Sequence, residues 1–239
     1  MIAKRYYTFA LALCCTFLAH SQWGTKLSKE TKTLTYNISG FDAIDVSDDF
    51  EVTLSFSNTQ KPIVVRANEN IADNVDVYKK GNTLYLRMKN MSNYSGKLIL
   101  EASVVAPMVT DYVISGDAVV GVTNEIKASN VSLMVKGDAI FKGAIQTGSL
   151  DLIATSDAQV ELSGSAENMK AEVRSDSEIS SRDFKVDHLN IELYGDSNAR
   201  IHVTKSLSAE AYGDSTLRYS GNPELIQVKE RGDSDIKRI

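Results

Sequence analysis

Aspartate recurs at a nearly fixed spacing through the second half of this sequence, and these carboxylates are the residues whose type and spacing could do chemistry. Successive copies are 18 to 21 residues apart, and each aspartate follows Gly or Ser and precedes Ala or Ser. Regularly spaced carboxylate oxygens could bind Ca²⁺, which takes about six to eight oxygen ligands. The seven aspartates are Asp117, Asp138, Asp157, Asp176, Asp196, Asp214 and Asp233.

A structural role is the alternative for these aspartates. Each copy supplies one carboxylate, and only the last copy adds a second acidic residue, Asp235. Aspartate is also a turn residue, because its side chain accepts hydrogen bonds from nearby backbone N–H groups. Such bonds can offset the repulsion between like charges about 5 Å apart in water, which is below ~1 kcal/mol. We therefore expect structural turn residues, with no metal ion and no other cofactor, and keep Ca²⁺ as the alternative.

Two tyrosines form the most specific candidate contact surface. Tyr194 and Tyr212 each stand two residues before a repeat aspartate, in a position that also holds Lys136, Arg174 and Arg231. Residues at the same position of successive repeats should lie side by side, so the two rings should stack. Exposed aromatic pairs contact sugars or partner proteins. These tyrosines are therefore the candidate binding surface for a glycan or a surface protein, and the alternative is that tyrosine stands there simply as a good strand residue.

Catalytic patterns are weak in this chain. Beyond the first 21 residues the two histidines, His188 and His202, stand outside the fixed positions of the repeat. No nucleophile elbow, zinc-protease motif or phosphate-binding loop is present. Asp183 and Asp187 could act as a carboxylate pair on a polysaccharide, but acidic pairs are frequent in this sequence. We expect a non-enzymatic protein, with a polysaccharide-active enzyme as a lesser alternative.

The elements that position these side chains follow from the repeat itself. Apolar or small residues occupy the positions five, three and one before each aspartate and one and three after it, with Glu230 in the last copy as the one exception. Such alternation indicates strands with one buried face and the aspartate on the other. Repetition at about 19 residues is typical of a solenoid. We therefore expect an all-β parallel solenoid over residues 107–239, with an antiparallel sandwich of hairpins as the alternative.

The first half of the chain alternates without the clean repeat. Apolar alternation predicts a strand or pair of strands over residues 44–56, and strands at 62–67 and 97–106. Lys80-Gly81-Asn82 should form a turn between two more strands. We assign residues 34–106 to a less regular β-rich N-terminal region, either a cap or a first lobe.

The first 21 residues have the features of a secretory signal peptide. A basic start, a short apolar core and small residues before Gln22 fit export, although a lipoprotein anchor at Cys14 or Cys15 is the rival. Residues 22–33 would form a polar leader. Both cysteines lie in the signal segment, and no second apolar run follows it, so we expect a mature protein without disulfides or membrane spans. The periplasm, the outer-membrane surface and the exterior all fit.

The charge of the chain excludes one class of partner. The formal net charge is −5, and no basic cluster interrupts the sequence. Since nucleic-acid binding needs basic patches, we expect no nucleic-acid partner.

Phrases in both halves of the chain resemble those of a known family. Gly40-Phe41-Asp42-Ala43-Ile44-Asp45-Val46, Gly81-Asn82-Thr83-Leu84-Tyr85-Leu86 and the serial Gly-Asp-Ser units are similar to the putative auto-transporter adhesin, head GIN domain family of secreted envelope proteins. The resemblance covers about residues 34–239. It implies a right-handed β-helix and an adhesin-like envelope module, and it supplies no catalytic residues. A purely structural envelope protein is the alternative function.

Overall fold

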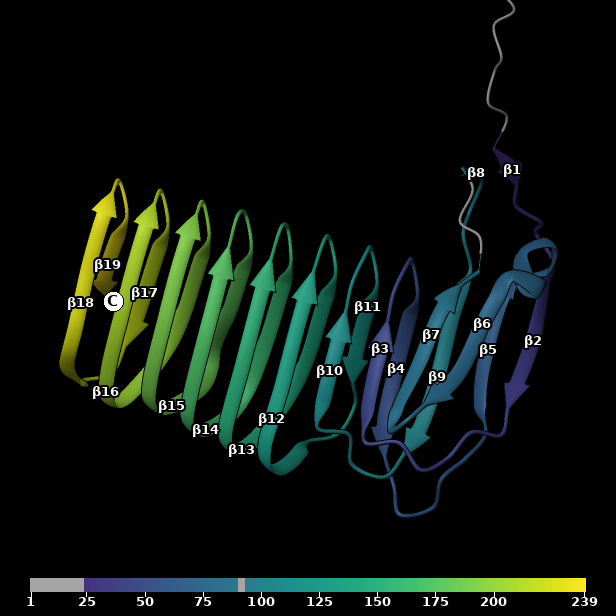
Figure 1. The fold of residues 1–239 in the computed structure, drawn as a ribbon, viewed down its shortest axis with the longest axis horizontal. Coiled ribbons are helices and arrows are strands. Elements are labelled where there is room, and N and C mark those ends of the chain that lie inside the picture. The colour runs from purple at the N-terminus through teal and green to yellow at the C-terminus, as the bar shows by residue number, and fades with distance from the viewer. Residues whose placement is uncertain (1–23, 90–92) are drawn as a thin grey trace, which may run out of the picture.

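The computed structural model describes residues 24–89 and 93–239, so the expected signal peptide lies outside the described residues. Two sheets, which we call front and back, face each other along the molecule (Figure 1). Along the chain, the strands of the front sheet come directly before the aspartate turns. In order along the molecule, the front sheet contains β6 (Val75–Lys80), β7 (Thr83–Met88), β3 (Ala43–Val46), β10 (Asp111–Ile114) and β12 (Ile126–Lys136). It continues with the second halves of β13 (Ile140–Thr155), β14 (Gln159–Arg174), β15 (Glu178–Gly195) and β16 (Asn198–Gly213), and it ends with β18 (Glu224–Gly232).

Along the chain, the strands of the back sheet come directly after the aspartate turns. The back sheet contains β2 (Thr31–Tyr36), β5 (Ile63–Asn68), β9 (Leu100–Ala106), β4 (Glu51–Phe56), β11 (Val119–Val122), the first halves of β13 to β16, β17 (Thr216–Ser220) and β19 (Asp235–Arg238). A 3₁₀ helix, η1 (Glu69–Asn74), and a small parallel pair, β1 (Thr25–Lys26) with β8 (Tyr94–Ser95), lie at the N-terminal end.

Parallel pairing in constant register confirms the predicted solenoid. Each long strand runs along the back sheet, bends, and returns along the front sheet to the next turn (Figure 1). Equivalent residues of successive repeats pair directly, as Leu152 does with Ala171 and Ala171 with Ile191. The result is a β-solenoid of about 7 turns with a spacing of ~19 residues. The coils pair in parallel, so the alternative sandwich of antiparallel hairpins is wrong.

The core lies between the sheets and is built from the repeated inward positions. In the copy around Asp117, for example, Tyr112, Ile114, Ala118 and Val120 are all buried. The residue directly before the aspartate was expected on this face, and that expectation is wrong. Gly116 is exposed and has φ of 73°, because a left-handed residue turns the chain there and interrupts the alternation of strand faces.

The solenoid includes a coil that the repeat pattern did not reveal. β3 pairs with β10 in parallel, and β4 pairs with β11. Asp48 therefore occupies the position of Gly116, with φ of 64°, and Asp49 occupies the position of Asp117. The sheet is continuous across the expected boundary at residues 106 and 107, and this coil belongs to the same stack as the later repeats.

The N-terminal end differs from the rest through antiparallel pairing. β2 pairs with β5, β5 with β9, and β6 with β7 around the predicted turn at Lys80-Gly81-Asn82. Of the strand or pair of strands predicted over residues 44–56, the structure has the pair, β3 and β4, separated by the turn at Asp48. No helix within residues 24–89 and 93–239 has the length and hydrophobicity needed to cross a bilayer.

Candidate functional site

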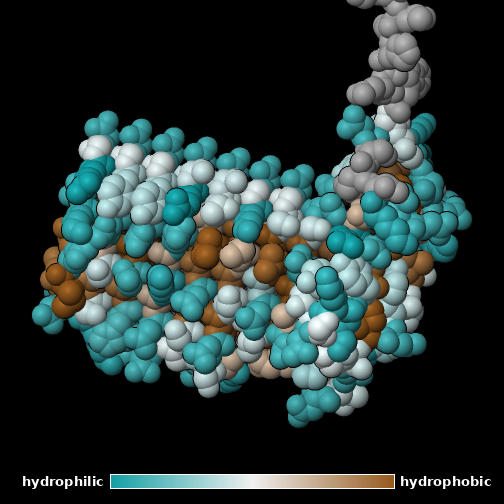
Figure 2. Space-filling model, viewed as in Figure 1, coloured by the Kyte–Doolittle hydropathy of each residue, from teal (hydrophilic) through white to brown (hydrophobic). Residues whose placement is uncertain are grey.

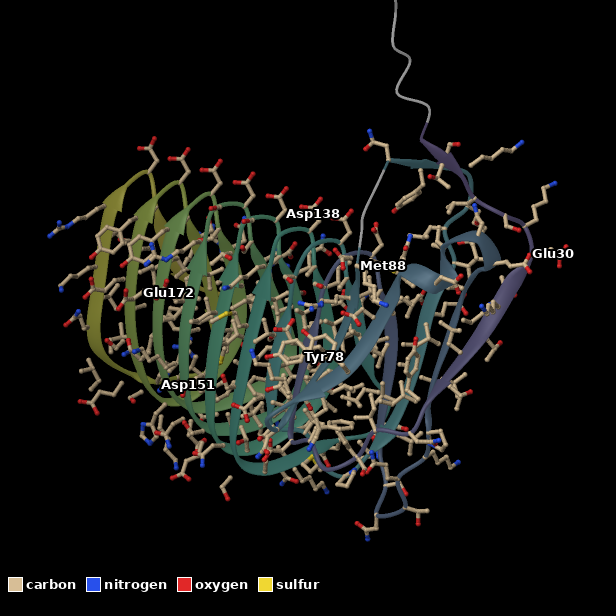
Figure 3. All side chains as sticks on the ribbon, turned by 45° about the vertical axis from the view of Figure 1, so that its right-hand side comes forward. Glu30, Tyr78, Met88, Asp138, Asp151 and Glu172 are labelled. Atoms are coloured by element: carbon tan, nitrogen blue, oxygen red, sulfur yellow. The ribbon has the colours of Figure 1, made fainter. Side chains whose placement is uncertain are left out.

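The repeat aspartates line the edge where the front sheet turns into the back sheet. Figure 3 shows a row of carboxylates pointing away from the protein along this edge, with Asp138 among them. Asp49 extends the row by one coil, and partial desolvation together with the carboxylates of Asp49 and Asp138 raises the pKa of Asp117. Neighbouring carboxylates are one strand spacing apart, about 4.8 Å.

The turns hold together through hydrogen bonds other than the expected ones. In the described part of the chain, no hydrogen bond ends on a carboxylate of the seven predicted aspartates. The backbone N–H of Asp157 instead donates to the Gly137 carbonyl oxygen of the preceding coil, at 3.1 Å. The residue after the aspartate is buried in every turn except the last, where Ser234 is half-buried. The Ser177 hydroxyl donates to the carbonyl oxygens of Arg174 and Ser156, at 2.7 and 3.0 Å. Ser197 and Ser234 donate to carbonyl oxygens in the same way, whereas the Ser215 hydroxyl has no partner among the described residues.

Metal ligation finds little geometric support along this edge. Among the described residues, no group of three or more His, Cys, Asp or Glu side chains converges on one point. A Ca²⁺ ion needs about six to eight oxygens, whereas each coil presents one carboxylate. The aspartates are arranged as a line of separate charges.

The two predicted tyrosines stack on the front sheet. The ring centroids of Tyr194 and Tyr212 are 5.0 Å apart with an interplanar angle of 6°, as expected for one position in neighbouring coils. Arg174 covers the outer face of Tyr194 at 4.6 Å, and Arg231 lies 5.8 Å from the centre of Tyr212. We call these four residues the tyrosine ladder. Both ring faces of each tyrosine are occupied within the ladder, so its ring edges and polar groups face outward.

A row of acidic side chains fixes the ladder from one side. The Tyr194 hydroxyl donates to Glu192 Oε2 at 2.7 Å, and this bond is the main reason that the pKa of Tyr194 is raised to about 12. Tyr212 donates to Glu210 in the same way, and Lys229 Nζ lies 2.8 Å from Glu210 Oε1. The hydrogen bonds from Lys229 and from Tyr212, in that order, are the main causes that lower the pKa of Glu210. These hydrogen bonds restrict the side-chain conformations of Tyr194 and Tyr212.

The same face carries a second tyrosine stack at its N-terminal end. Tyr78 and Tyr85 are 4.9 Å apart at 6°, and Arg87 covers Tyr78 at 4.7 Å. Between the two stacks, three apolar residues point outward from neighbouring strands at half-buried positions: Val113, Met134 and Ile153. Figure 2 shows hydrophobic residues reaching the middle of this face. The front face thus combines aromatic, apolar and charged sections on a flat sheet.

One member of the alternative catalytic pair is held by neighbouring side chains. Asp183 and Asp187 are four residues apart on β15, whose pairing with β16 is irregular between Ser181 and Lys185 and between Val186 and His188. Asp187 is bound by Lys205 at 2.7 Å and by the Thr204 hydroxyl at 2.6 Å, which lowers its pKa. His188 and His202 each bond a serine of the next coil.

Comparison with known proteins identifies relatives of this fold. A family model described as "Putative auto-transporter adhesin, head GIN domain" matches residues 40–223. A crystal structure of a putative adhesin from Bacteroides fragilis has a TM-score of 0.83 at 18% identity, covering 90% of this chain and 100% of that chain. One from Parabacteroides merdae has a TM-score of 0.71 at 18% identity, covering 90% and 98%.

A third similar structure carries a different description. It is a putative lipid binding protein from Parabacteroides distasonis, with a TM-score of 0.69 at 16% identity, covering 90% of this chain and 98% of that one. No curated protein matches the chain in sequence. At these identities the structural likeness establishes the fold alone.

Proposed function

Because this chain belongs to the putative auto-transporter adhesin, head GIN domain family, we propose that it is an exported, non-enzymatic envelope protein that binds a glycan or a surface protein through its front face. The observation that carries this proposal is the tyrosine ladder. Its Arg174, Tyr194, Tyr212 and Arg231 side chains stand in a row across four neighbouring strands. A row already ordered by stacking loses little conformational entropy on binding.

The ladder favours partners that hydrogen-bond to its outward edge. Because the ring faces are covered, a sugar ring cannot lie flat on either tyrosine. The outward groups are guanidinium nitrogens, phenol oxygens and the carboxylates of Glu192 and Glu210, which donate to and accept from hydroxyls and amides alike. Tyr and Arg are also the residues that contribute most at protein interfaces. Both partner classes therefore stay within the proposal.

Lipid binding, which the description of the P. distasonis relative suggests, has less support here. A hollow of about 640 Å³ is shallow and is lined by residues such as Lys142, Glu161 and Asp183. An acyl chain needs an apolar enclosure, because burying charged groups against it costs free energy. The apolar section of the front face at Met134 is flat and open by comparison.

The ladder offers a direct test with a matched control. Replacing Tyr194 and Tyr212 by Ala should weaken binding by about tenfold or more in a screen of glycans and envelope proteins. The double variant Tyr78→Ala and Tyr85→Ala removes an equivalent stack from the other end of the same face and should bind as the wild type does. Equal binding by all three proteins would refute a role for the ladder.

Location is tested separately, by protease treatment of intact cells beside a periplasmic control protein. Digestion in intact cells is the result that we expect of a surface adhesin. Protection until the outer membrane is opened would refute adhesion and favour a structural role in the periplasm.

A further inference from the structure

A long shallow trough crosses the back sheet, on the side of the molecule opposite the tyrosine ladder. Three hollows make it up, with volumes of about 230, 640 and 410 Å³. The first spans β5, β9 and β4, the second runs from β4 to β15, and the third from β15 to β17. The first two share Thr53, and the last two meet on β15, where Ser180 and Glu178 are neighbours on the outward face.

Small residues form the floor of the trough at its centre. Gly121 on β11 points toward open space, with no atom within 4 Å of the position that a Cβ would occupy. Its register partner on β13, the next strand, is Lys142, and Ala144 is the following outward residue of that strand. Gly143 faces inward, since a Cβ there would lie 3.1 Å from the ring of the buried Phe141. The low surface at Gly121 and Ala144, on neighbouring strands, deepens the trough at its centre.

The walls carry hydroxyl groups and charges of both signs. Thr53, Ser163 and Ser180 provide hydroxyls, while the charged side chains are mostly joined across neighbouring strands. Lys142 and Glu161 form an ion pair of 2.8 Å inside the trough. At the two ends, Arg66 pairs with Glu101 at 2.8 Å, and Arg218 with Asp235 at 2.7 Å. The trough is therefore polar and close to neutral, so an anionic polymer would gain little from it.

The direction of the trough decides which kind of polymer it suits. An extended peptide binds a sheet by adding a strand at an edge, where backbone groups are free. The trough instead crosses the middle of the back sheet, where the backbone groups of β11, β13, β14 and β15 are already paired in ladders. Recognition must then come from side-chain hydroxyls, carboxylates and ammonium groups. These groups pair with a ligand that presents many hydroxyls and no charge.

We infer that the trough binds a neutral linear polysaccharide lying along the solenoid axis. From β9 to β17 it crosses seven strand spacings of about 4.8 Å, roughly 34 Å in all. Each coil thus meets the polymer at a regular interval, and affinity accumulates over several sugar residues. This site is separate from the tyrosine ladder and does not depend on the function proposed for the ladder.

Gly121→Trp tests the inference, because an indole at this position fills the trough without meeting backbone. Ser132→Trp on the exposed face of β12 is the matched control, since it adds the same side chain to the front sheet. The full chain would be run by affinity electrophoresis through gels containing dextran, mannan, xylan or β-glucan, with polygalacturonate as the anionic comparison. Circular dichroism during heating confirms that both variants fold.

At least one neutral polymer should slow the wild type, and Gly121→Trp should weaken that binding by about tenfold or more. Ser132→Trp and the Tyr194→Ala, Tyr212→Ala double variant should migrate as the wild type does. Absence of retardation by every neutral polymer, or equal retardation of Gly121→Trp, overturns the inference. Retention on immobilised unfolded casein that Gly121→Trp abolishes, without polysaccharide binding, also overturns it and assigns the trough to a polypeptide.

Discussion

The left-handed residue before each aspartate should be the point at which the solenoid is most sensitive to a single methyl group. Gly213 has φ of 81°, and a Cβ there would lie 3.0 Å from the Gly195 carbonyl oxygen of the preceding coil. The left-handed conformation costs an L-residue about 1–2 kcal/mol, and the close contact adds to this. Reduced entropy of the unfolded chain returns about 0.4–1 kcal/mol. Gly213→Ala should therefore destabilise the protein by about 1–2 kcal/mol.

Gly121→Ala is the control for this prediction, because it makes the same chemical change without either penalty. Its added Cβ meets no atom within 4 Å, so the entropy effect alone should stabilise the protein slightly. Guanidinium unfolding followed by far-ultraviolet circular dichroism gives both free energies. If the two variants agree within about 0.5 kcal/mol, the turn conformation does not limit stability, and the reasoning is refuted.

Three further outcomes follow from the turns, the ladder and the last coil. Glu192→Ala should lower the pKa of Tyr194 from about 12 toward its ordinary value of about 10, as read by ultraviolet titration against Tyr194→Phe. Because folding raises the pKa of Tyr194, the stability that its hydrogen bond to Glu192 contributes is complete below pH ~10 and is lost toward pH ~12. An unchanged Tyr194 titration in Glu192→Ala would contradict this assignment of the pKa shift. Ser177→Ala should cost about 1 kcal/mol, whereas Ser215→Ala, which removes a buried hydroxyl without a partner among the described residues, should be neutral or stabilising. Equal losses of unfolding free energy in the two variants would show that the hydrogen bonds of the turn hydroxyl do not stabilise the protein. Glu230→Val should cause self-association detectable by light scattering. Glu230 replaces an inward apolar residue of the last coil and accepts a hydrogen bond from a backbone N–H of β19 at 2.5 Å. An unchanged mass would show that this glutamate does not prevent association through the exposed edge of the last coil.

The repeat predicted the solenoid because each coil specifies the same inward set in the sequence. The coil around Asp49 escaped notice for a physical reason. Asp48 replaces the usual Gly or Ser there, and Phe50 replaces the small residue after the aspartate. The Phe50 side chain is fully buried in this coil, so the small-residue pattern does not apply there. Sequence spacing also fails, because β5 to β9 intervene before the next coil.

The candidate sites were accessible from sequence to different degrees. The stacking of Tyr194 and Tyr212 followed from their shared position, and that position also holds Arg174 and Arg231. The complete ladder could therefore have been predicted from all the residues that stand two positions before a repeat aspartate. The trough could not be predicted in this way, because it is lowest where two small residues on adjacent strands, Gly121 and Ala144, both line it. Such a hollow becomes visible only when the register between strands is known.

The order in which the coils pair has a consequence for how the chain acquires its structure. β3 and β4 are among the first strands to be synthesised, and they lie against β10 and β11. Once that distant contact has formed, every later coil needs only to pair with the coil made just before it. Such local contacts form quickly, whereas the single distant one is slow. The N-terminal coil can thus serve as a template, and the solenoid can grow residue by residue in the direction in which the chain emerges during synthesis or export.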